Sequence, residues 1–238
     1  DRLRSRGLGD VYKRQYLYCT FSIDFLSLLN YAIYVSCKGG KTMSTKLSDL
    51  SEISLGTILT RVKPKSELQS FKQISTISMQ ELSYICGKDD SSFDEIISKI
   101  DIEKVDKCLL TKENDIVIGL SSQMAMVITK ERANSLLLSN FCLVRVNDTN
   151  LLDPYYFAWL FNENSIMKHQ LTSSTQGQSY VKMITLDVIR DLELDLPPIN
   201  KQILIGKIYY QSIRKNRYER RLIELKQLLL NKKLENIL

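Results

Sequence analysis

The stretch that decides the fold is Leu196-Pro-Pro-Ile-Asn-Lys-Gln202. It places two prolines directly before a segment that contains no further proline up to Leu238. Proline fixes φ and lacks an N–H, so the pair at 197 and 198 ends the strand before it. Asn200 is placed to cap the first free backbone donors of a helix. The stretch predicts one long helix over Lys201–Leu238, which at ~1.5 Å per residue would be about 57 Å long.

This predicted helix carries an apolar seam. A helix of this length is longer than a domain of this size can cover, so we expect a second helix to lie along it. The polar positions Gln211 and Lys215 would set the register of such a pair. The alternative is a core helix that folds back on its own domain. The apolar seam positions are Leu204, Ile208, Tyr218, Leu222, Leu225 and Leu229.

The region before the proline pair is rich in short strand patterns. Ile116-Val-Ile118 is a β-branched run, and Met124–Thr129 and Phe141–Val146 are two further apolar runs of strand length. Phe71–Ser83 alternates loosely and is also expected as a strand. Phe93–Val105 is ambiguous, with an acidic and lysine-bearing composition typical of a surface segment.

A helix is expected to begin at Asp153-Pro154, since aspartate caps a helix and proline is tolerated in its first turn. It continues through Met167 with aromatic side chains that we expect in the core. Ile184–Leu196 follows as a short turn and strand. The fold class is therefore α+β: a mixed, β-rich domain over residues 43–198, followed by a coiled-coil helix over residues 199–238.

Residues 1–42 differ in character from the rest. Asp1–Gln15 resembles translated adaptor sequence, and Tyr16–Cys37 is an apolar run that carries Asp24 and Asn30, both costly inside a membrane. We expect residues 1–42 to be a non-native or upstream-translated leader before a start at Met43. An N-terminal membrane anchor is the alternative.

The formal net charge of +6 is unevenly distributed. Residues 1–42 contain 7 basic and 3 acidic side chains, residues 43–200 contain 16 and 21, and residues 201–238 contain 10 and 3. The middle of the chain is therefore acidic. Any contact with a polyanion requires a local basic patch or the terminal helix.

We find no catalytic or metal-binding set. The five cysteines are at least 18 residues apart, and the only histidine is His169, so neither forms a ligand cluster. No glycine-rich phosphate loop ends in Lys-Ser/Thr. The one Glu-x-Lys triplet, Glu224–Lys226, is expected to be surface charge. We expect no metal, no cofactor and no catalysis, and the scattered thiols are compatible with a cytoplasmic location.

Two polar stretches are candidates for contacting nucleic acid. Arg61, Lys63 and Lys65 flank Pro64 in an expected loop and could hold phosphates, although three cations in a loop could also be only solvated. The loop over residues 172–182 is rich in Ser, Thr and Gln, and glutamine can pair bidentately with an adenine edge. Its candidate contacts are Ser173, Ser174, Thr175, Gln176, Gln178, Ser179, Tyr180 and Lys182.

In their order and spacing these stretches resemble one half of the DNA specificity subunit of type I restriction–modification systems. The resemblance covers about Met43–Leu238, and the family more often has Gly-Asp where this chain has Asn114-Asp115. The matching features are Leu47–Gly56, Asn114–Val117, Ser139–Phe141, Asp153–Tyr156, the polar loop up to Lys182, and Leu194–Gln202 before the long helix.

The resemblance implies a non-catalytic target recognition domain that reads one part of a split site in double-stranded DNA, with a helix that acts as a paired spacer. It also implies methylation subunits, which bind S-adenosylmethionine, and through them a restriction subunit. The family's subunit has two recognition domains and two long helices, so this chain would form a homodimer, pair with a second specificity half, or be a fragment. The alternative is a membrane-anchored or soluble coiled-coil interaction scaffold without base-specific DNA binding.

Overall fold

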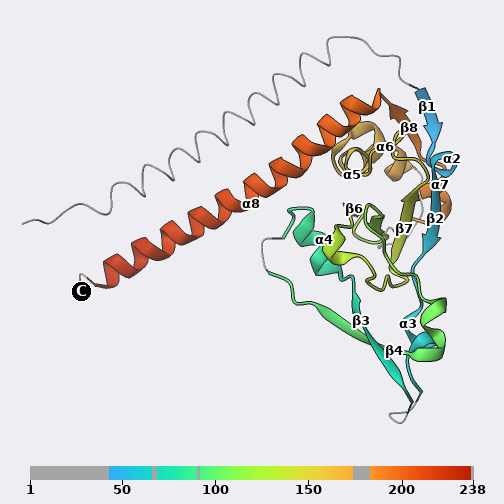
Figure 1. Cartoon of the computed structure of the whole chain (residues 1–238). Coiled ribbons are helices and arrows are strands. Elements are labelled where there is room, and N and C mark those ends of the chain that lie inside the picture. The colour runs from blue at the N-terminus through green and yellow to red at the C-terminus, as the bar shows by residue number, and fades with distance from the viewer. Residues whose placement is uncertain (1–42, 66–68, 90–91, 174–182, 237–238) are drawn as a thin grey trace, which may run out of the picture. The chain divides into compact units, whose positions relative to one another are not determined.

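The computed structural model describes residues 43–65, 69–89, 92–173 and 183–236, which belong to the compact unit Thr42–Leu238. The fold is α+β, as expected (Figure 1). The strands are β1 (Met43–Lys46), β2 (Ser51–Leu55), β3 (Phe71–Thr76), β4 (Ile96–Asp101), β5 (Ile116–Gly119), β6 (Met124–Val127), β7 (Phe141–Val146) and β8 (Glu193–Leu196). The helices are α2 (Leu47–Leu50), α3 (Leu59–Val62), α4 (Met79–Ile85), α5 (Pro154–Glu163), α6 (Ser165–Ser173), α7 (Leu186–Arg190) and α8 (Ile199–Glu235), with 3-10 turns η1 (Ile102–Lys107) and η2 (Lys130–Arg132).

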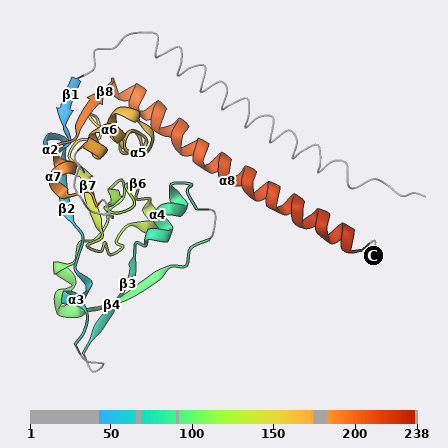
Figure 2. The same ribbon diagram turned by 180° about the vertical axis from the view of Figure 1, so that it is seen from behind.

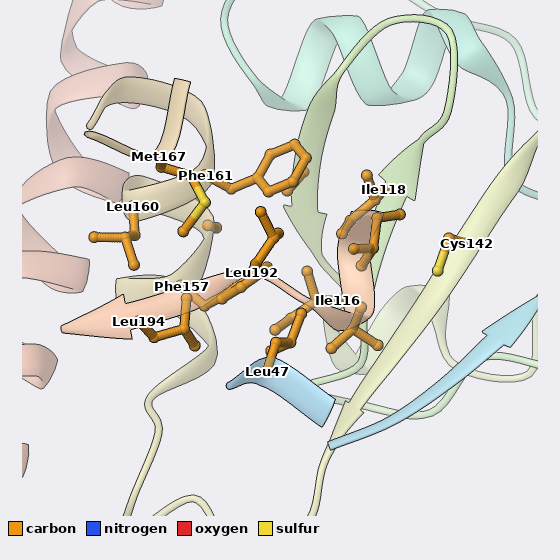
Figure 3. Close-up of a cluster of buried hydrophobic side chains, with 14 of the residues drawn as sticks. Leu47, Ile116, Ile118, Cys142, Phe157, Leu160, Phe161, Met167, Leu192 and Leu194 are labelled. Carbon is orange, nitrogen blue, oxygen red and sulfur yellow. The ribbon is translucent and has the colours of Figure 1, made fainter. Parts of the chain in front are cut away.

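A four-stranded antiparallel sheet of order β2-β7-β5-β6 forms the centre of the domain. All of β5 is buried because both faces of the sheet are covered. Ile116 and Ile118 point into the core against α5, whereas Val117 points into a second core beneath α4. Figure 3 shows Ile116 and Ile118 beside Phe157 and Phe161 of α5. The apolar runs at β5, β6 and β7 are therefore strands of this sheet, as the sequence predicted.

Helix α5 begins as the sequence predicted, but it ends earlier. The Asp153 carboxylate accepts a hydrogen bond of 2.8 Å from the Tyr156 amide, and Pro154 occupies the first turn. The helix ends at Glu163, and the side chain of the next residue, Asn164, accepts from the amides of Ile166 and Met167 and so starts α6. The expectation of one continuous helix through Met167 was wrong because Asn164 caps a new one.

The expected strand over Phe71–Ser83 was also only partly correct. Strand β3 ends at Thr76, and Ser78 then caps α4 by accepting a hydrogen bond of 3.0 Å from the Glu81 amide. A serine followed three residues later by a glutamate is a helix-start signal, which the loose apolar alternation of this stretch concealed. The ambiguous segment Phe93–Val105 contains β4 and part of η1.

The side chain of Asn162 joins three elements. It accepts from the Ala125 amide at 2.8 Å, and it donates to the Ala125 carbonyl at 2.7 Å and to the Tyr209 hydroxyl at 3.0 Å. Ala125 lies in β6, which is the edge strand of the central sheet, so the amide of Asn162 satisfies backbone groups that would otherwise be unpaired. This one residue connects the sheet, α5 and α8.

Helix α8 is 37 residues long and begins at Ile199. Asn200 is not its cap: Pro198 holds the cap position, and the Pro198 carbonyl accepts from the amides of Lys201 and Gln202. Gln202 is buried, accepts from the Asp153 amide at 3.0 Å, and donates to the carbonyls of Leu151 and Pro197 at 2.9 Å. Its side chain therefore fastens the start of α8 to the start of α5.

The proximal part of the long helix follows the alternative expectation of a helix that folds back on its own domain, whereas the pairing of the distal part with a second helix stays a prediction. Leu204 is buried within the domain, and Ile205 and Tyr209 pack on the main core, so the proximal part folds back on its own domain. The distal part, from Tyr218 onward, still contacts the end of α4 through Arg220, whose side chain donates to the Gly87 carbonyl, and beyond Arg220 it extends away from the other described elements (Figures 1 and 2). Its exposed apolar side chains are Tyr218, Ile223, Leu225, Leu228, Leu229, Leu230 and Leu234.

Gly206 allows α8 to approach α5 closely. A Cβ at this position would lie 2.7 Å from the Tyr155 Cβ, 2.8 Å from an Asp153 carboxylate oxygen and 2.9 Å from the Tyr156 amide nitrogen. We expect Gly206→Ala to lower the free energy of unfolding by about 1–3 kcal/mol, the usual cost of overpacking. Urea denaturation followed by circular dichroism measures this change.

Helix propensity alone predicts the opposite sign, since alanine is favoured over glycine in a helix by about 1 kcal/mol. Asn216→Ala is the control, because this exposed position of the same helix has no such contact. A Gly206→Ala variant as stable as the native chain would contradict the close packing of α8 on α5.

Candidate nucleic-acid interface

Strands β3 and β4 form a two-stranded antiparallel ribbon separate from the central sheet (Figure 1). The register runs from Phe71 opposite Asp101 to Thr76 opposite Ile96. One face of the ribbon is buried, because Ile74 and Ile100 pack with Leu136 in a small third core. The other face is exposed over most of its length.

Helix α3 packs on the buried side of this ribbon. Val62 is 4% exposed and belongs to the same small core as Ile74 and Ile100. Arg61 and Lys63 flank Val62 in sequence and are exposed, as is Lys65. The expected basic loop is therefore a helical turn at Arg61 followed by extended backbone at Lys63, and Val62 holds these cations beside the ribbon.

These elements form the basic part of an acidic domain. We define the basic lobe as residues 57–76 and 96–108, which contain α3, the ribbon and η1. The lobe has seven basic and four acidic side chains, whereas the remaining residues of 43–200 have nine and 17. The net charge of the lobe is +3, whereas the net charge of the remaining residues of 43–200 is −8. The lobe is therefore a local cationic patch within this acidic region, and the terminal helix, with 10 basic and 3 acidic side chains over residues 201–238, is the other cationic part of the chain.

A buried ion pair positions the ribbon relative to the sheet. The Arg132 guanidinium donates two hydrogen bonds of 2.6 Å to the Glu81 carboxylate, which is 1% exposed. Arg132 also donates to the Ser75 hydroxyl at 2.7 Å and to the Glu95 carboxylate at 2.9 Å. One side chain thus connects η2, α4 and the base of the ribbon.

The Asn114-Asp115 turn has a structural role. Asn114 has φ 67°, in the left-handed region that glycine adopts without strain and that asparagine tolerates. This explains why asparagine is tolerated at position 114, where the family that the sequence resembles more often has glycine. Asp115 is 2% exposed and accepts hydrogen bonds of 2.8 and 2.6 Å from Arg145 of β7.

The expected polar loop lies largely outside the described residues. This applies to Ser174, Thr175, Gln176, Gln178, Ser179, Tyr180 and Lys182. Ser173 ends α6, and its hydroxyl donates to the His169 carbonyl at 2.7 Å. Leu171–Ser173 is therefore helical rather than loop. Ser173 and Arg61 lie on elements that pack against different cores, since α6 contributes to the main core and α3 to the small one.

The thiols in the described part of the chain are not built for nucleophilic chemistry. Burial raises the pKa of Cys86 and of Cys142 to about 12, and it also raises the pKa of Cys108. Over residues 43–65, 69–89, 92–173 and 183–236, no group of three or more His, Cys, Asp or Glu side chains could hold a metal ion. None of the helices described there is long and apolar enough to span a membrane.

Comparisons with known proteins give one family. The family model described as type I restriction modification DNA specificity domain matches residues 32–227. No curated protein matches the chain in sequence.

Among solved structures, a chain from work on complex assembly and conformational transition of the type I R-M system has a TM-score of 0.56 and 13% identity, and the match covers 83% of this chain and 49% of that one. The type I restriction-modification S subunit from M. genitalium has a TM-score of 0.45 and 15% identity, covering 82% and 45%. The HsdS subunit from Thermoanaerobacter tengcongensis has a TM-score of 0.45 and 16% identity, covering 94% and 54%. The first of these supports the same fold, and this chain spans about half the length of all three.

The Glu81–Arg132 pair should be important for stability. We expect Glu81→Ala to lower the free energy of unfolding by about 3 kcal/mol, because it leaves a largely buried guanidinium without its main partner. Chemical denaturation measures the loss. Glu224→Ala breaks the exposed pair with Arg221 and is the control, with an expected change below about 1 kcal/mol. Equal effects of the two substitutions would contradict the assigned role of Arg132.

Proposed function

Because this chain belongs to the family of type I restriction modification DNA specificity domains, we propose that it is a non-catalytic DNA-recognition component that reads one part of a split double-stranded site. The observation that carries the proposal is the basic lobe. A domain that is acidic elsewhere would be repelled by DNA, except where this lobe meets the phosphates.

The phosphate contacts that we propose are Arg61, Lys63 and Lys65. All three are exposed, and no acidic side chain in the described part of the chain forms an ion pair with them. The packing of Val62 supports this role, because it limits the positions that the neighbouring cations can take. The polar loop from Ser173 to Lys182 remains a second proposed contact, supported by the hydrogen-bonding capacity of its Gln and Ser side chains.

The distal part of α8 is proposed to pair with another long helix. Apolar side chains that are exposed over such a length stabilise a helix only when a partner covers them. The positions Tyr218, Leu222, Leu225 and Leu229 follow the spacing of a coiled-coil seam. The partner would be a second copy of the chain or a second specificity half, and the paired helices would hold two recognition domains apart.

The remaining partners are also part of the proposal. Methylation subunits would dock on this chain, bind S-adenosylmethionine and supply the catalysis, and a restriction subunit would join through them. The whole complex would act on DNA in the cytoplasm. A coiled-coil scaffold without base-specific binding explains the exposed face of α8, but it does not explain a basic lobe on an acidic domain.

Removing the proposed phosphate contacts should weaken DNA binding without changing base preference. We expect Arg61→Ala, Lys63→Ala and Lys65→Ala together to reduce the slope of log affinity against log salt by about 3, since each contact contributes about 0.9. Fluorescence anisotropy over a salt series measures this.

The control replaces Lys46, Lys168 and Arg190, which are exposed, lie outside the basic lobe and already pair with acidic side chains. A triple lobe variant with the native salt slope would rule out these contacts.

Disrupting the distal seam should separate the paired chains. We expect Leu222→Asp with Leu225→Asp to abolish the dimer or the pairing with a second half, and with it binding to the split site. Sedimentation velocity and binding to a duplex with both half-sites measure the two effects. The control, Gln227→Asp with Asn231→Asp, adds the same charge on the opposite side of the helix. A monomeric variant with full binding to the split site would disprove the spacer role.

A further inference from the structure

The exposed face of the β3–β4 ribbon carries two polar side chains directly opposite each other. Gln73 pairs in register with Lys99, and both are exposed. Paired residues of an antiparallel ribbon point to the same side, and alternate residues share that side. Phe71 and Ile97 therefore lie on the same face as Gln73 and Lys99, whereas Ile74 and Ile100 lie on the buried face.

The side chains of Gln73 and Lys99 on this face have few partners within the domain. No side chain or backbone group in the described part of the chain forms a hydrogen bond with the side-chain amide of Gln73. The Lys99 ammonium lies 4.8 Å from the centroid of the Phe71 ring, which orients it but leaves its protons available. Phe71 is 40% exposed and Ile97 is 57% exposed. Two large apolar side chains beside two unpaired polar ones are typical of a surface that a partner covers.

The ribbon is held rigidly on both sides. Val62 of α3 and Val105 of η1 pack on its buried side, and the Arg132 guanidinium fixes Ser75, which lies at the base of the ribbon on the same face as Gln73 and Ile97. A rigid surface loses little conformational entropy on binding, so more of the interaction energy remains for discrimination.

We propose that this face enters the major groove and reads bases, with Gln73 and Lys99 as specificity-determining residues. The inference rests on the proposed DNA recognition function and names the surface that performs it. The major groove is about 12 Å wide and admits a two-stranded β-ribbon. Glutamine fits the N6 and N7 edge of adenine, lysine the O6 and N7 of guanine, and an aliphatic side chain such as Ile97 the methyl group of thymine.

The geometry also sets how many base pairs the two residues read. Side chains directly opposite in an antiparallel ribbon have Cβ atoms about 5 Å apart. Successive base pairs are about 3.4 Å apart along the duplex. Gln73 and Lys99 therefore read the same base pair or neighbouring ones, within the part of the duplex that the positive charge of the basic lobe holds.

The test is a selection from a pool of randomised DNA duplexes, using the full chain in the assembly in which it binds DNA. We expect Gln73→Ala and Lys99→Ala each to reduce the preference at one base pair by about tenfold or more, and to leave the other positions unchanged. Lys72→Ala is the matched control. It removes the same charge from the same ribbon, but Lys72 pairs with Ile100 and so lies on the opposite face.

Gln73→Glu gives a second readout that a misfolded variant cannot imitate. Glutamate accepts a hydrogen bond from the cytosine amino group, so the preferred base at that position should change rather than be lost. Native preferences retained by Gln73→Ala, Gln73→Glu and Lys99→Ala would overturn the inference while leaving DNA recognition by another surface intact. A native chain that selects no sequence at all would overturn the proposed function, and the inference with it.

Discussion

The contact between α5 and α8 is the interaction on which the rest of the structure depends. Helix α5 fills the main core with Phe157 and Phe161, and Asn162 on the same helix satisfies the edge of the central sheet. Gly206 then lets α8 pack directly on its start. The long helix leaves the domain in a fixed direction because it is held at two places. It packs on α5 through Gly206 and Tyr209, and it contacts the end of α4, where Arg217 donates to the Tyr84 carbonyl and Arg220 to the Gly87 carbonyl. A spacer needs such a rigid connection if the distance between two recognition domains is to be defined.

The domain separates its two proposed tasks in space and in chemistry. The apolar seam is on the distal part of α8, whereas positive charge within the acidic domain is concentrated in the basic lobe. These surfaces use different forces, since the hydrophobic effect pairs helices and electrostatic attraction holds phosphates. The acidic remainder of residues 43–200 would also direct an approaching duplex, because it repels DNA whereas the basic lobe and the basic helix α8 attract it. Orientation on DNA can therefore precede any reading of bases.

Much of the fold was predictable because its signals are local. The start of α5 was predictable because Asp153 and Pro154 act within one helical turn. Strand β5 was predictable because a β-branched run of this length fits a buried strand. The errors occurred where two local signals competed. Apolar alternation concealed the capping serine of α4, and the aromatic run before Met167 concealed the new helix that Asn164 starts. In each case the hydrogen bonds accepted by one side chain decided the boundary.

The sequence by itself determined the α+β class, the strands β5, β6 and β7, the long terminal helix and the cationic character of Arg61, Lys63 and Lys65. These follow from periodicity, turn chemistry and charge, which act over a few residues. Only the tertiary structure decided that Leu204 is buried while Leu225 is exposed, and that Gln73 lies opposite Lys99. Such placements depend on strand register and on contacts between residues far apart in the chain. No local pattern encodes them, because a shift of one residue in register moves every side chain of a strand to the other face.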